Sequence, residues 1–298
     1  MDLVPFDDRD GSIWFDGKLI PWRDAKVHVL SHALHYASCV FEGERVYNGE
    51  VFKLTQHSQR LIDAAMVMGF DLGYTLEEVN AATNATVAAN GIVDGYVRPV
   101  AWRGAEQMGV AAQHSKIHFA IATWVWPSYF PAELRQKGIR LTFAKWKRPH
   151  PDTAPSTVKA AGLYMICTLS KHAAEAEGYT DAVMLDWQGR IAESTGSNIF
   201  LVINGELHTP VADCFLNGIT RQTVIELARK RGFKVFERDI WPEELAKAQE
   251  AFLTGTAAEI TPVGEIGPYR FAPAAVTAAL IADFDVLVGR VPSSAAAQ

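Results

Sequence analysis

Cysteine is scarce in this sequence: the 298 residues include only three, Cys39, Cys167 and Cys214. They are an odd number, lie far apart and form no CxxC pair, so the sequence is not that of a disulfide-stapled protein. Isolated cysteines of this kind are usually small core residues of proteins in a reducing compartment. We therefore expect a protein of the cytoplasm.

Long apolar runs and basic clusters are missing as well. No uninterrupted apolar stretch is long enough to cross a bilayer, and the acidic N-terminus, MDLVPFDDRDG, lacks the basic-then-apolar layout of a signal peptide. The formal net charge is -6 and no basic run occurs, which makes nucleic acid and anionic membranes poor candidates for a partner. These absences favour a soluble protein that binds neither nucleic acid nor membrane.

The chain is long enough for two domains, each with its own core. Apolar residues make up 49% and charged residues 21%, proportions that are typical of globular proteins and exclude disorder. The segment PSYFPAE holds two prolines that interrupt regular structure, so we place the domain boundary there. The sequence thus predicts a small N-terminal domain over residues 1–127, an interdomain loop over 128–137 and a larger C-terminal domain over 138–298.

Apolar periodicity and turn residues predict the local elements, and their mixture favours an α+β fold over a regularly alternating parallel sheet. Hairpins are predicted to turn at the pairs 16–17, 188–189 and 204–205, each with a glycine between apolar flanks. Helices are expected over 54–68, 76–90, 160–178 and 220–232, and from about 273. Strands are expected over 95–103, 117–126, 138–146, 233–240 and 250–256.

Three histidines, His28, His32 and His35, lie close together in VHVLSHALHYASCVFEGERVY. A metal site is one interpretation of this group. Their spacing fits no familiar ligand pattern and no cysteine or carboxylate complements it, so we expect no bound metal.

Lys159 lies in the segment PSTVKAAGLY, among small residues where a surface helix usually carries more charges. Burial beside apolar or small neighbours lowers the pKa of a lysine and leaves a neutral amine, which is a strong nucleophile toward an aldehyde. Enzymes commonly prepare a lysine in this way to hold a carbonyl cofactor as a Schiff base. The alternative is an ordinary solvated surface lysine, which is the commoner case.

Two glycine turns are candidates for binding a phosphate group. In NGITRQT a glycine precedes a helix, so the backbone N–H groups of Ile219 and Thr220 would point outward at the positive end of the helix dipole. In FLTGTAAEITP the turn presents backbone N–H groups and the hydroxyl of Thr256. Such turns are frequent without a phosphate. With the charge of Arg60, however, these donors are enough for one phosphate monoester.

Glu193, in GRIAESTGSNIF, is either a solvated charge on a hairpin or a carboxylate that pairs with a protonated pyridine nitrogen. Tyr164 and Asn198 are possible hydrogen-bond partners for a ring hydroxyl. A lysine, a phosphate site and an acidic partner are together what pyridoxal 5'-phosphate requires.

Period-two alternation in GYVRPVAWR places Tyr96, Arg98, Val100 and Trp102 on one face of a strand. An arginine between a tyrosine and a valine should be paired with an anion or lie at the mouth of a cleft. This face is therefore a candidate substrate-binding surface, with Tyr96 and Arg98 as its polar groups.

The sequence resembles the branched-chain-amino-acid aminotransferases, which belong to the fold-type IV group of pyridoxal-phosphate enzymes. The resemblance runs from about Ile13 to Phe284 and is carried by HALHYASCVFEG, YVRP, QMGV, the lysine segment, ESTGSNIF, GITR and GTAAEITP. It implies a small N-terminal α/β domain, a larger barrel-like C-terminal α/β domain and a cofactor in the cleft between them. It also implies transamination of leucine, isoleucine and valine with 2-oxoglutarate, which gives branched 2-oxo acids and L-glutamate.

The resemblance implies a role for each candidate cofactor residue. Lys159 is implied as the Schiff-base lysine and Glu193 as the partner of the pyridine nitrogen. The remaining implied cofactor residues are, for the phosphate, Arg60, Ile219, Thr220 and Thr256 and, near the ring hydroxyl, Tyr164 and Asn198.

The implied substrate pocket accepts both an aliphatic amino acid and glutamate. Its apolar wall matches Phe41, Trp126 and Tyr129. The groups that receive the distal carboxylate of glutamate match Tyr36 and Arg98. An apolar slot with one arginine at its edge would bind both kinds of side chain.

Two further features of the family complete the implied pocket. The backbone of Ala257 and Ala258 matches the site for the α-carboxylate. Val110, in the QMGV segment, matches a residue lent by the neighbouring subunit. The resemblance therefore implies a homodimer or a higher homo-oligomer.

Three places depart from the family pattern. Glu44 stands where the family usually has an apolar residue, Leu163 stands where a small polar residue is common, and Arg103 lies in a stretch that is usually more apolar. We expect the charges of Glu44 and Arg103 on the surface, since charges are rarely buried without partners. These departures bear on the range of substrates rather than on the reaction.

Other functions stay open at this point. Within the fold type they are a D-amino-acid or (R)-selective amine transaminase and a carbon–carbon lyase such as aminodeoxychorismate lyase. Tyr36 and the YVRP segment argue against both, while Glu44 and Arg103 leave room for an amine acceptor. A carrier that binds pyridoxal phosphate without turning it over would not need the carboxylate-binding Arg98.

Overall fold

The computed structural model describes residues 4–126 and 137–290, which form two compact units. Of the described residues, the first unit holds 4–126 and 158–162, and the second holds 137–157 and 163–290.

The domain bounds expected from the sequence, 1–127 and 138–298, stay a prediction, and the first described range ends at residue 126. The segment 158–162 carries Lys159 and belongs to the first unit, although the predicted C-terminal domain would include it. The predicted interdomain loop lies outside the described residues, except for Lys137.

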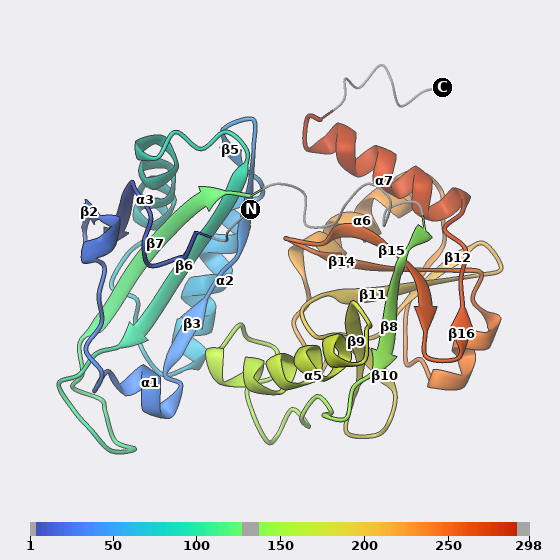
Figure 1. The fold of residues 1–298 in the computed structure, drawn as a ribbon, viewed down its shortest axis with the longest axis horizontal. Coiled ribbons are helices and arrows are strands. Elements are labelled where there is room, and N and C mark those ends of the chain that lie inside the picture. The colour runs from blue at the N-terminus through green and yellow to red at the C-terminus, as the bar shows by residue number, and fades with distance from the viewer. Residues whose placement is uncertain (1–3, 127–136, 291–298) are drawn as a thin grey trace. The chain divides into compact units, whose positions relative to one another are not determined.

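The first unit is built on one sheet (Figure 1). Its strands are β1 Ser12–Phe15, β2 Lys18–Pro21, β3 Cys39–Phe41, β4 Glu44–Tyr47, β5 Glu50–Val51, β6 Gly95–Arg103 and β7 Ile117–Val125. They lie in the order β2-β1-β7-β6-β4-β5, β3 also pairs with β6, and every described pair is antiparallel. Its helices are η1 Trp22–Asp24, α1 His32–Tyr36, α2 Leu54–Val67 and α3 Leu76–Ala89.

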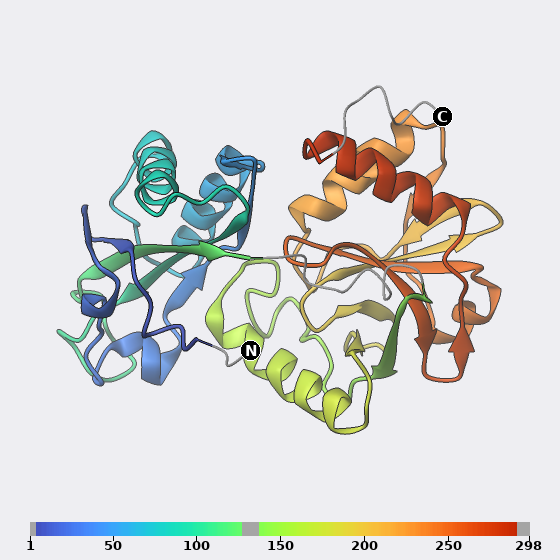
Figure 2. The same ribbon diagram turned by 45° about the horizontal axis from the view of Figure 1, so that its top comes forward.

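Apolar side chains cover both faces of this sheet. On one face, α2 and α3 bury a core that includes Val46, Leu61, Val79, Val97 and Phe119. On the other face, a cluster that includes Ile13, Trp22, Trp102 and Ala120 packs against Ala33 of α1. Figure 2 shows α2 and α3 on one side of the sheet and α1 on the other.

The second unit is built on a larger mixed sheet. Its strands are β8 Ile139–Phe143, β9 Asp181–Leu185, β10 Ile191–Ser194, β11 Asn198–Ile203, β12 Glu206–Thr209, β13 Val235–Glu237, β14 Glu250–Gly255, β15 Glu259–Ile266 and β16 Tyr269–Arg270. They lie in the order β10-β9-β8-β15-β14-β11-β12-β13, and β16 pairs with β15. Three pairs of neighbouring strands are parallel: β8 with β9, β8 with β15, and β12 with β13.

An apolar core on this second sheet includes Leu141, Val183, Leu201, Leu253 and Val263, and Leu245 is its one described member from a helix. The described helices of the second unit are α5 Met165–Ala176, α6 Ile219–Lys230, η3 Pro242–Lys247 and α7 Ala275–Leu287. The 3-10 turn η2 Ala161–Tyr164 begins in the first unit and ends in the second. The last two α-helices, α6 and α7, lie side by side (Figures 1 and 2) and contact β14 and β15.

The predicted turns and most predicted elements are confirmed. Asn204 and Gly205 both have positive φ, 54° and 77°, as a two-residue turn of this type requires, and β11 pairs with β12 across them. The helices predicted from 54, 76 and 220 begin within one residue of those positions. The helix predicted over 160–178 differs, because it starts with the 3-10 turn η2 before α5.

The sequence analysis missed a long strand of the second unit, β15. This strand contains Pro262 and Gly264, residues that argue against a strand interior. The pairing of β15 with β8 shifts register between Val263 and Glu265, and a Cβ at Gly264 would lie 2.6 Å from the carbonyl oxygen of Lys137. Glycine is therefore needed where two backbones approach closely.

The α+β fold class is confirmed by the mixture of antiparallel and parallel strands with packed helices. Within the described residues, none of the helices combines the length and apolar character needed to cross a membrane.

Candidate active site

Lys159 lies on a short segment that runs beside β3 in the first unit. The main-chain N–H of Phe41 donates to the carbonyl oxygen of Lys159 at 3.1 Å, and Val40 and Ala160 form an antiparallel bridge. The half-buried lysine points over an aromatic ring, with its Nζ 5.0 Å from the ring centre of Phe41. A long-range strand contact therefore places the amine at the face of Phe41.

Phe41 is also covered by Arg98 of β6. The guanidinium carbon of Arg98 lies 5.0 Å from the ring centre of Phe41, and its Nη2 donates to the hydroxyl of Tyr96 at 3.4 Å. The predicted sharing of one face by Tyr96 and Arg98 is thus confirmed by their contact. The amine of Lys159 and the guanidinium of Arg98 both lie within cation–π distance of one ring.

Arg98 forms part of the wall of an apolar cavity of about 400 Å³ within the first unit. Among the described lining residues, Arg98 alone carries a charge. Its apolar neighbours there include Val27, Leu34, Cys39, Val100, Trp102 and Ala161. A single cation in an otherwise apolar wall favours ligands with an aliphatic part and one anionic end.

Arg60 of α2 is held by a buried carboxylate that the sequence analysis did not identify. Glu42 is 0% exposed, and its two oxygens accept from Nε and Nη2 of Arg60 at 2.6 and 2.8 Å. His57 donates from Nδ1 to the same carboxylate at 2.8 Å. Burial alone would raise the pKa of Glu42, but the charge of Arg60 and the hydrogen bond from His57 hold it well below its usual range.

The expectation of a surface-exposed Glu44 is wrong. Glu44 is 0% exposed, and within the described part of the chain neither carboxyl oxygen has a hydrogen-bond partner. Its partner in the β4–β6 register is Val97, so its side chain points with that of Val97 into the core under α2 and α3. Burial, reinforced by the charge of Glu42, raises the pKa of Glu44 well above its usual value.

Arg103, which was also expected on the surface, is half-buried and binds main-chain oxygens. Its Nη1 donates to the carbonyl oxygen of Ala112 at 3.2 Å and its Nη2 to that of Gly69 at 2.6 Å. Its guanidinium also covers the ring of Phe70 at 5.3 Å. Arg103 therefore ties the loop between β6 and β7 to the end of α2. The third departure, Leu163, is half-buried and is the residue at which the chain returns to the second unit.

Glu193 lies on β10 in the second unit and is only 7% exposed. The side-chain amide of Asn198 donates to its Oε2 at 3.2 Å, and Nε of the buried Arg148 lies 3.5 Å from its Oε1. The solvated-charge interpretation is therefore wrong. A buried carboxylate held by a cation and an amide is suited to accept a hydrogen bond from a protonated ring nitrogen of a ligand.

Asn198 also fixes the start of α6. Its Nδ2 donates to the carbonyl oxygen of Leu216 at 3.0 Å, and its Oδ1 accepts from the N–H of Gly218 at 3.2 Å. A Cβ at position 218 would lie 2.3 Å from that Oδ1, so only glycine fits. Gly218 is the N-cap of α6 and gives no side chain to the N–H groups of its first turn, which begins at Ile219 and Thr220. The helix start thus keeps the donors and the dipole that favour an anion.

The second candidate phosphate turn connects β14 and β15. Thr256, Ala257 and Ala258 are each half-buried, and the hydroxyl of Thr261 donates to the carbonyl oxygen of Ala258 at 2.6 Å. Glu259, the next residue, has a positive φ of 52° and is paired with Arg290 beyond the end of α7. The turn is therefore anchored at its C-terminal side by an ion pair.

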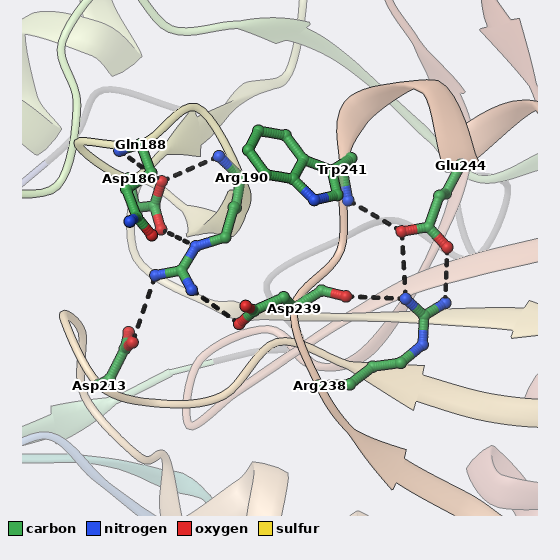
Figure 3. Close-up of polar contacts among 8 residues, drawn as sticks. All are labelled: Asp186, Gln188, Arg190, Asp213, Arg238, Asp239, Trp241 and Glu244. Carbon is green, nitrogen blue, oxygen red and sulfur yellow. Dashed lines mark hydrogen bonds and ion pairs between the residues drawn. The ribbon is translucent and has the colours of Figure 1, made fainter.

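The hairpin that carries Glu193 is anchored at its turn by Arg190 (Figure 3). This guanidinium is surrounded by three carboxylates: Asp186 at 2.5 Å, Asp239 at 2.8 Å and Asp213 at 3.3 Å. Asp186 also accepts from the N–H groups of Gln188 and Arg190, which closes the turn. Nearby, Arg238 binds Glu244 with two nitrogens, and Glu244 accepts from the N–H of Trp241. The contacts of Arg190 fix the start of β10, the strand that carries Glu193.

The remaining predicted residues lie at varied depths. Tyr164 is half-buried at the N-cap of α5, and the ring of Trp126 lies 5.8 Å from that of Tyr96. Tyr36 is 43% exposed and Val110 is 88% exposed. Tyr129 lies outside the described residues.

The three histidines near the N-terminus bind main-chain groups. His28 accepts from the N–H of Leu30, while Nε2 of His32 and of His35 lie 2.8 Å and 2.9 Å from the carbonyl oxygens of Gly109 and Val29. In the described ranges 4–126 and 137–290, no group of three or more histidine, cysteine, aspartate or glutamate side chains could hold a metal ion.

The donor chemistry fits a phosphorylated pyridine aldehyde. Such a cofactor needs an amine, an anion for its ring nitrogen and N–H donors for its phosphate. Lys159 has an amine of this kind, Glu193 is a buried carboxylate, and the start of α6 has N–H groups that no capping side chain occupies. Glu42 and His57, which hold Arg60, and Arg148, which lies at Glu193, were missed because no local pattern marks a pair formed between distant segments.

Comparison with known proteins gives consistent matches over most of the chain. Residues 39–266 match the profile of the family described as amino-transferase class IV. A branched-chain-amino-acid aminotransferase of Pseudomonas aeruginosa is 42% identical over 263 residues, which are 87% of this chain and 86% of that protein.

Solved structures agree with these matches. The branched-chain aminotransferase of the archaeon Thermoproteus uzoniensis, determined with norvaline, is similar at a TM-score of 0.90 and 38% identity, over 96% of this chain and 97% of its own. The branched-chain amino acid aminotransferase of Thermobaculum terrenum, determined in its PLP form, is similar at a TM-score of 0.86 and 30% identity, over 94% of each chain.

These likenesses confirm the resemblance found in the sequence. They also confirm the prediction of a pyridoxal-phosphate cofactor, since a similar structure was determined in its cofactor-bound form. Together with the buried carboxylate, the open helix start and the lysine over Phe41, they establish that the chain belongs to the class IV aminotransferase family.

Proposed function

We propose that this protein transfers the amino group of branched-chain L-amino acids (leucine, isoleucine and valine) to 2-oxoglutarate, giving branched 2-oxo acids and L-glutamate. The observation that carries the proposal is Arg98 in the wall of an otherwise apolar cavity, close to the aromatic ring under Lys159. The apolar part suits an aliphatic side chain, and the guanidinium suits the distal carboxylate of glutamate. Similar proteins bear the name branched-chain-amino-acid aminotransferase.

When bound, pyridoxal 5'-phosphate supplies an aldehyde for the amino group and a ring that withdraws electrons from the substrate. Lys159 holds the cofactor through its amine. Once released, this amine takes the proton from the substrate Cα as a base and later gives it up as an acid. Glu193 binds the ring nitrogen and keeps it protonated. The other cofactor-binding residues are Arg60, Ile219, Thr220 and Thr256 for the phosphate, and Tyr164 and Asn198 for the ring hydroxyl.

The substrate side chain lies against Phe41, Trp126 and Tyr129 in this proposal. The distal carboxylate of glutamate binds to Arg98, with Tyr36 and Tyr96 beside it. The shared α-carboxylate, present in every substrate, binds to the backbone at the turn that contains Ala257 and Ala258.

The proposal includes a homodimer or a larger homo-oligomer. Val110 and Met108 are 88% and 47% exposed on the loop between β6 and β7, Val29 before α1 is 72% exposed, and Leu34 on α1 is 63% exposed. Apolar side chains gathered in this way mark a surface that another copy covers. The three free cysteines support function in the cytoplasm.

An amino-donor panel tests the function. Purified protein loaded with pyridoxal 5'-phosphate is mixed with L-leucine, L-glutamate, D-alanine or 1-phenylethylamine, and the absorbance change of the cofactor is followed. We expect rapid change with L-leucine and L-glutamate only. Faster reaction with D-alanine or the amine would instead assign one of the other transaminases of this fold type, and no change with any donor would assign a carrier.

Lys159→Ala tests the role of the amine. We expect loss of turnover by at least about 10³-fold and no borohydride-trapped adduct. The matched control is Lys145→Ala, because Nζ of Lys145 also lies over an aromatic ring, that of Trp146, at 5.6 Å. An adduct that maps to any residue other than Lys159 would end the assignment.

A further inference from the structure

Glu259 has an unusual backbone conformation directly after the second candidate phosphate turn. Its φ is +52°, in the left-handed region that residues other than glycine seldom adopt. It pairs with Gly255 across the turn that contains Thr256, Ala257 and Ala258, in the hairpin of β14 and β15. Three-residue hairpin turns often end on a residue in this conformation, and glycine is the usual choice there. A glutamate at this place needs contacts that hold it.

Arg290, the last described residue, supplies these contacts. Its two terminal nitrogens bind the two carboxylate oxygens of Glu259, which is 6% exposed, and Nη1 lies 2.8 Å from Oε2. The same Nη1 donates to the carboxylate of Asp285, and the N–H of Arg290 donates to the carbonyl oxygen of Asp285, both at 2.9 Å. A guanidinium bound through two nitrogens fixes the position and the plane of a carboxylate. Arg290 therefore holds Glu259 from a segment 31 residues away in the chain.

Helix α7, which leads to Arg290, is attached to the sheet at its other end as well. The buried carboxylate of Glu250 on β14 accepts from the N–H groups of Val276 and Thr277 at 3.1 and 2.8 Å. Such bonds stabilise the start of a helix and fix it in place. The helix then packs along β14 and β15 (Figures 1 and 2). Because its start is tied to β14, its end brings Arg290 to the turn at a defined place.

The charge of Arg290 matters as well as its geometry. The turn is proposed to bind two anions, the cofactor phosphate and the substrate α-carboxylate. A carboxylate directly after the turn repels such anions, and burial leaves this repulsion weakly screened. Arg290 opposes the charge of Glu259. The side chain of Asp285 is 23% exposed against 8% for Glu259, so solvent screens the charge of Asp285 more effectively.

We propose that Arg290 is a positioning residue for the turn that binds the cofactor phosphate and the substrate α-carboxylate. It holds Glu259 in the left-handed conformation that orients the N–H groups of the turn, and it opposes the charge of that glutamate. The inference rests on the proposed transaminase function and on the proposed roles of Thr256, Ala257 and Ala258. It predicts an effect shared by every amino acid substrate, because all of them carry an α-carboxylate.

Arg290→Met tests this proposal. We expect an increase of about tenfold in the Kd for pyridoxal 5'-phosphate, measured by fluorescence titration of the apo-protein, because the turn loses its orientation and its compensating charge. KM should rise about tenfold for L-leucine and for L-glutamate alike, with kcat within about twofold. The matched control is Arg231→Met, which removes the two-nitrogen pair of Arg231 with Asp283, a contact of α7 with the end of α6. The control should keep the wild-type Kd and KM.

Combining Glu259→Gly with Arg290→Met separates positioning from stability. Glycine adopts a positive φ without an ion pair and carries no charge. We therefore expect the cofactor Kd and both KM values of the double variant to return to within about threefold of the wild-type values. Its melting temperature should stay below that of the wild type, because the ion pair is still absent. A lowered melting temperature in both variants without this recovery would assign Arg290 a structural role only and overturn the proposal.

The proposal is also overturned by wild-type Kd and KM values for Arg290→Met, or by a KM that rises for one donor only. If Arg290→Met does not fold, Arg290→Lys replaces it. Lysine keeps the charge but not the two-nitrogen geometry, so the cofactor Kd should rise about threefold, and a wild-type Kd would overturn the proposal. A wild-type protein that binds the cofactor but does not transaminate contradicts the proposed function alone, because the cofactor Kd of the variants still tests Arg290.

Discussion

Both carboxylate oxygens of Glu42 accept hydrogen bonds from the guanidinium of Arg60, at 2.6 and 2.8 Å. The carboxylate is 0% exposed and also accepts from His57, so it is held in one orientation. A two-pronged pair of this kind fixes the plane of the guanidinium. The proposed phosphate arginine is therefore oriented by a residue that the cofactor itself need not touch.

Glu42→Gln should weaken cofactor binding and destabilise the protein. The amide keeps the shape of the side chain but leaves Arg60 without its opposite charge, which costs about 3–5 kcal/mol for a buried pair. We expect an increase of about tenfold in the Kd for pyridoxal 5'-phosphate, measured by fluorescence titration of the apo-protein, because Arg60 is no longer held in place. Urea unfolding gives the change in stability.

The matched control for this experiment is Glu265→Gln. Glu265 also binds an arginine, Arg140, through both oxygens, but in the second unit and away from the proposed phosphate groups. The substitution Glu265→Gln should leave the cofactor Kd unchanged. The same cofactor Kd for Glu42→Gln and for the wild type would show that Glu42 does not position Arg60.

Glu44 should make the protein less stable as the pH rises. Because its pKa is raised in the folded state, the folded protein keeps a proton that the unfolded chain releases above its ordinary pKa near 4.5. The free energy of unfolding therefore falls with rising pH from that value up to the folded pKa. Glu44→Gln removes this titration, so its stability advantage over the wild type should be larger at pH 8 than at pH 5.

A second substitution, Glu44→Leu, removes the buried polar group as well. Compared with Glu44→Gln, it should raise the free energy of unfolding by about 1–3 kcal/mol, since unpaired buried polar groups are costly. Urea unfolding of the three proteins at both pH values measures these differences. The same difference between wild type and Glu44→Gln at pH 5 and pH 8 would show that Glu44 is not a buried neutral acid.

Arg98→Gln should lower kcat/KM for L-glutamate far more than for L-leucine. Its guanidinium is the charge in the wall of the apolar cavity and donates to Tyr96. We expect kcat/KM to fall about 10²-fold or more for L-glutamate and less than about tenfold for L-leucine, because the charge-assisted hydrogen bonds serve only the distal carboxylate. Arg23→Gln, on a surface arginine paired with Asp8 and Asp10, is the control. Equal losses for both donors would remove the proposed role of Arg98.

The cysteines should be almost unreactive in the folded protein. Burial raises the pKa of Cys39 and of Cys167 to about 11 and that of Cys214 to about 12. At pH 8 the thiolate fraction of each is then on the order of 10⁻³ or less. Reaction with a thiol-specific chromogenic disulfide should be slow for all three in native buffer and fast in urea. Rapid reaction of one thiol in the folded state would contradict its burial.

Local patterns in the sequence predicted the elements that depend on neighbouring residues. The Asn204-Gly205 turn, the alternation that joins Tyr96 to Arg98, and the glycine before α6 were all found in this way. Each depends on backbone conformations that adjacent side chains favour or forbid. The motifs around Lys159 and Glu193 likewise indicated the cofactor, because their chemistry is visible without the fold.

Only the tertiary structure decided which distant residues meet. All four residues of β4 are buried, so no alternation of polar and apolar residues revealed that Glu44 faces the core. The pairs Glu42–Arg60, Arg148–Glu193 and His32–Gly109 depend on strand order and register. The sequence by itself determined the turns and most helices and indicated the cofactor, since these depend on local conformation and side-chain chemistry. Long-range pairing decided which charges are buried and which side chains hold the candidate site residues Arg60 and Glu193. No local period encodes the register between segments far apart in the chain.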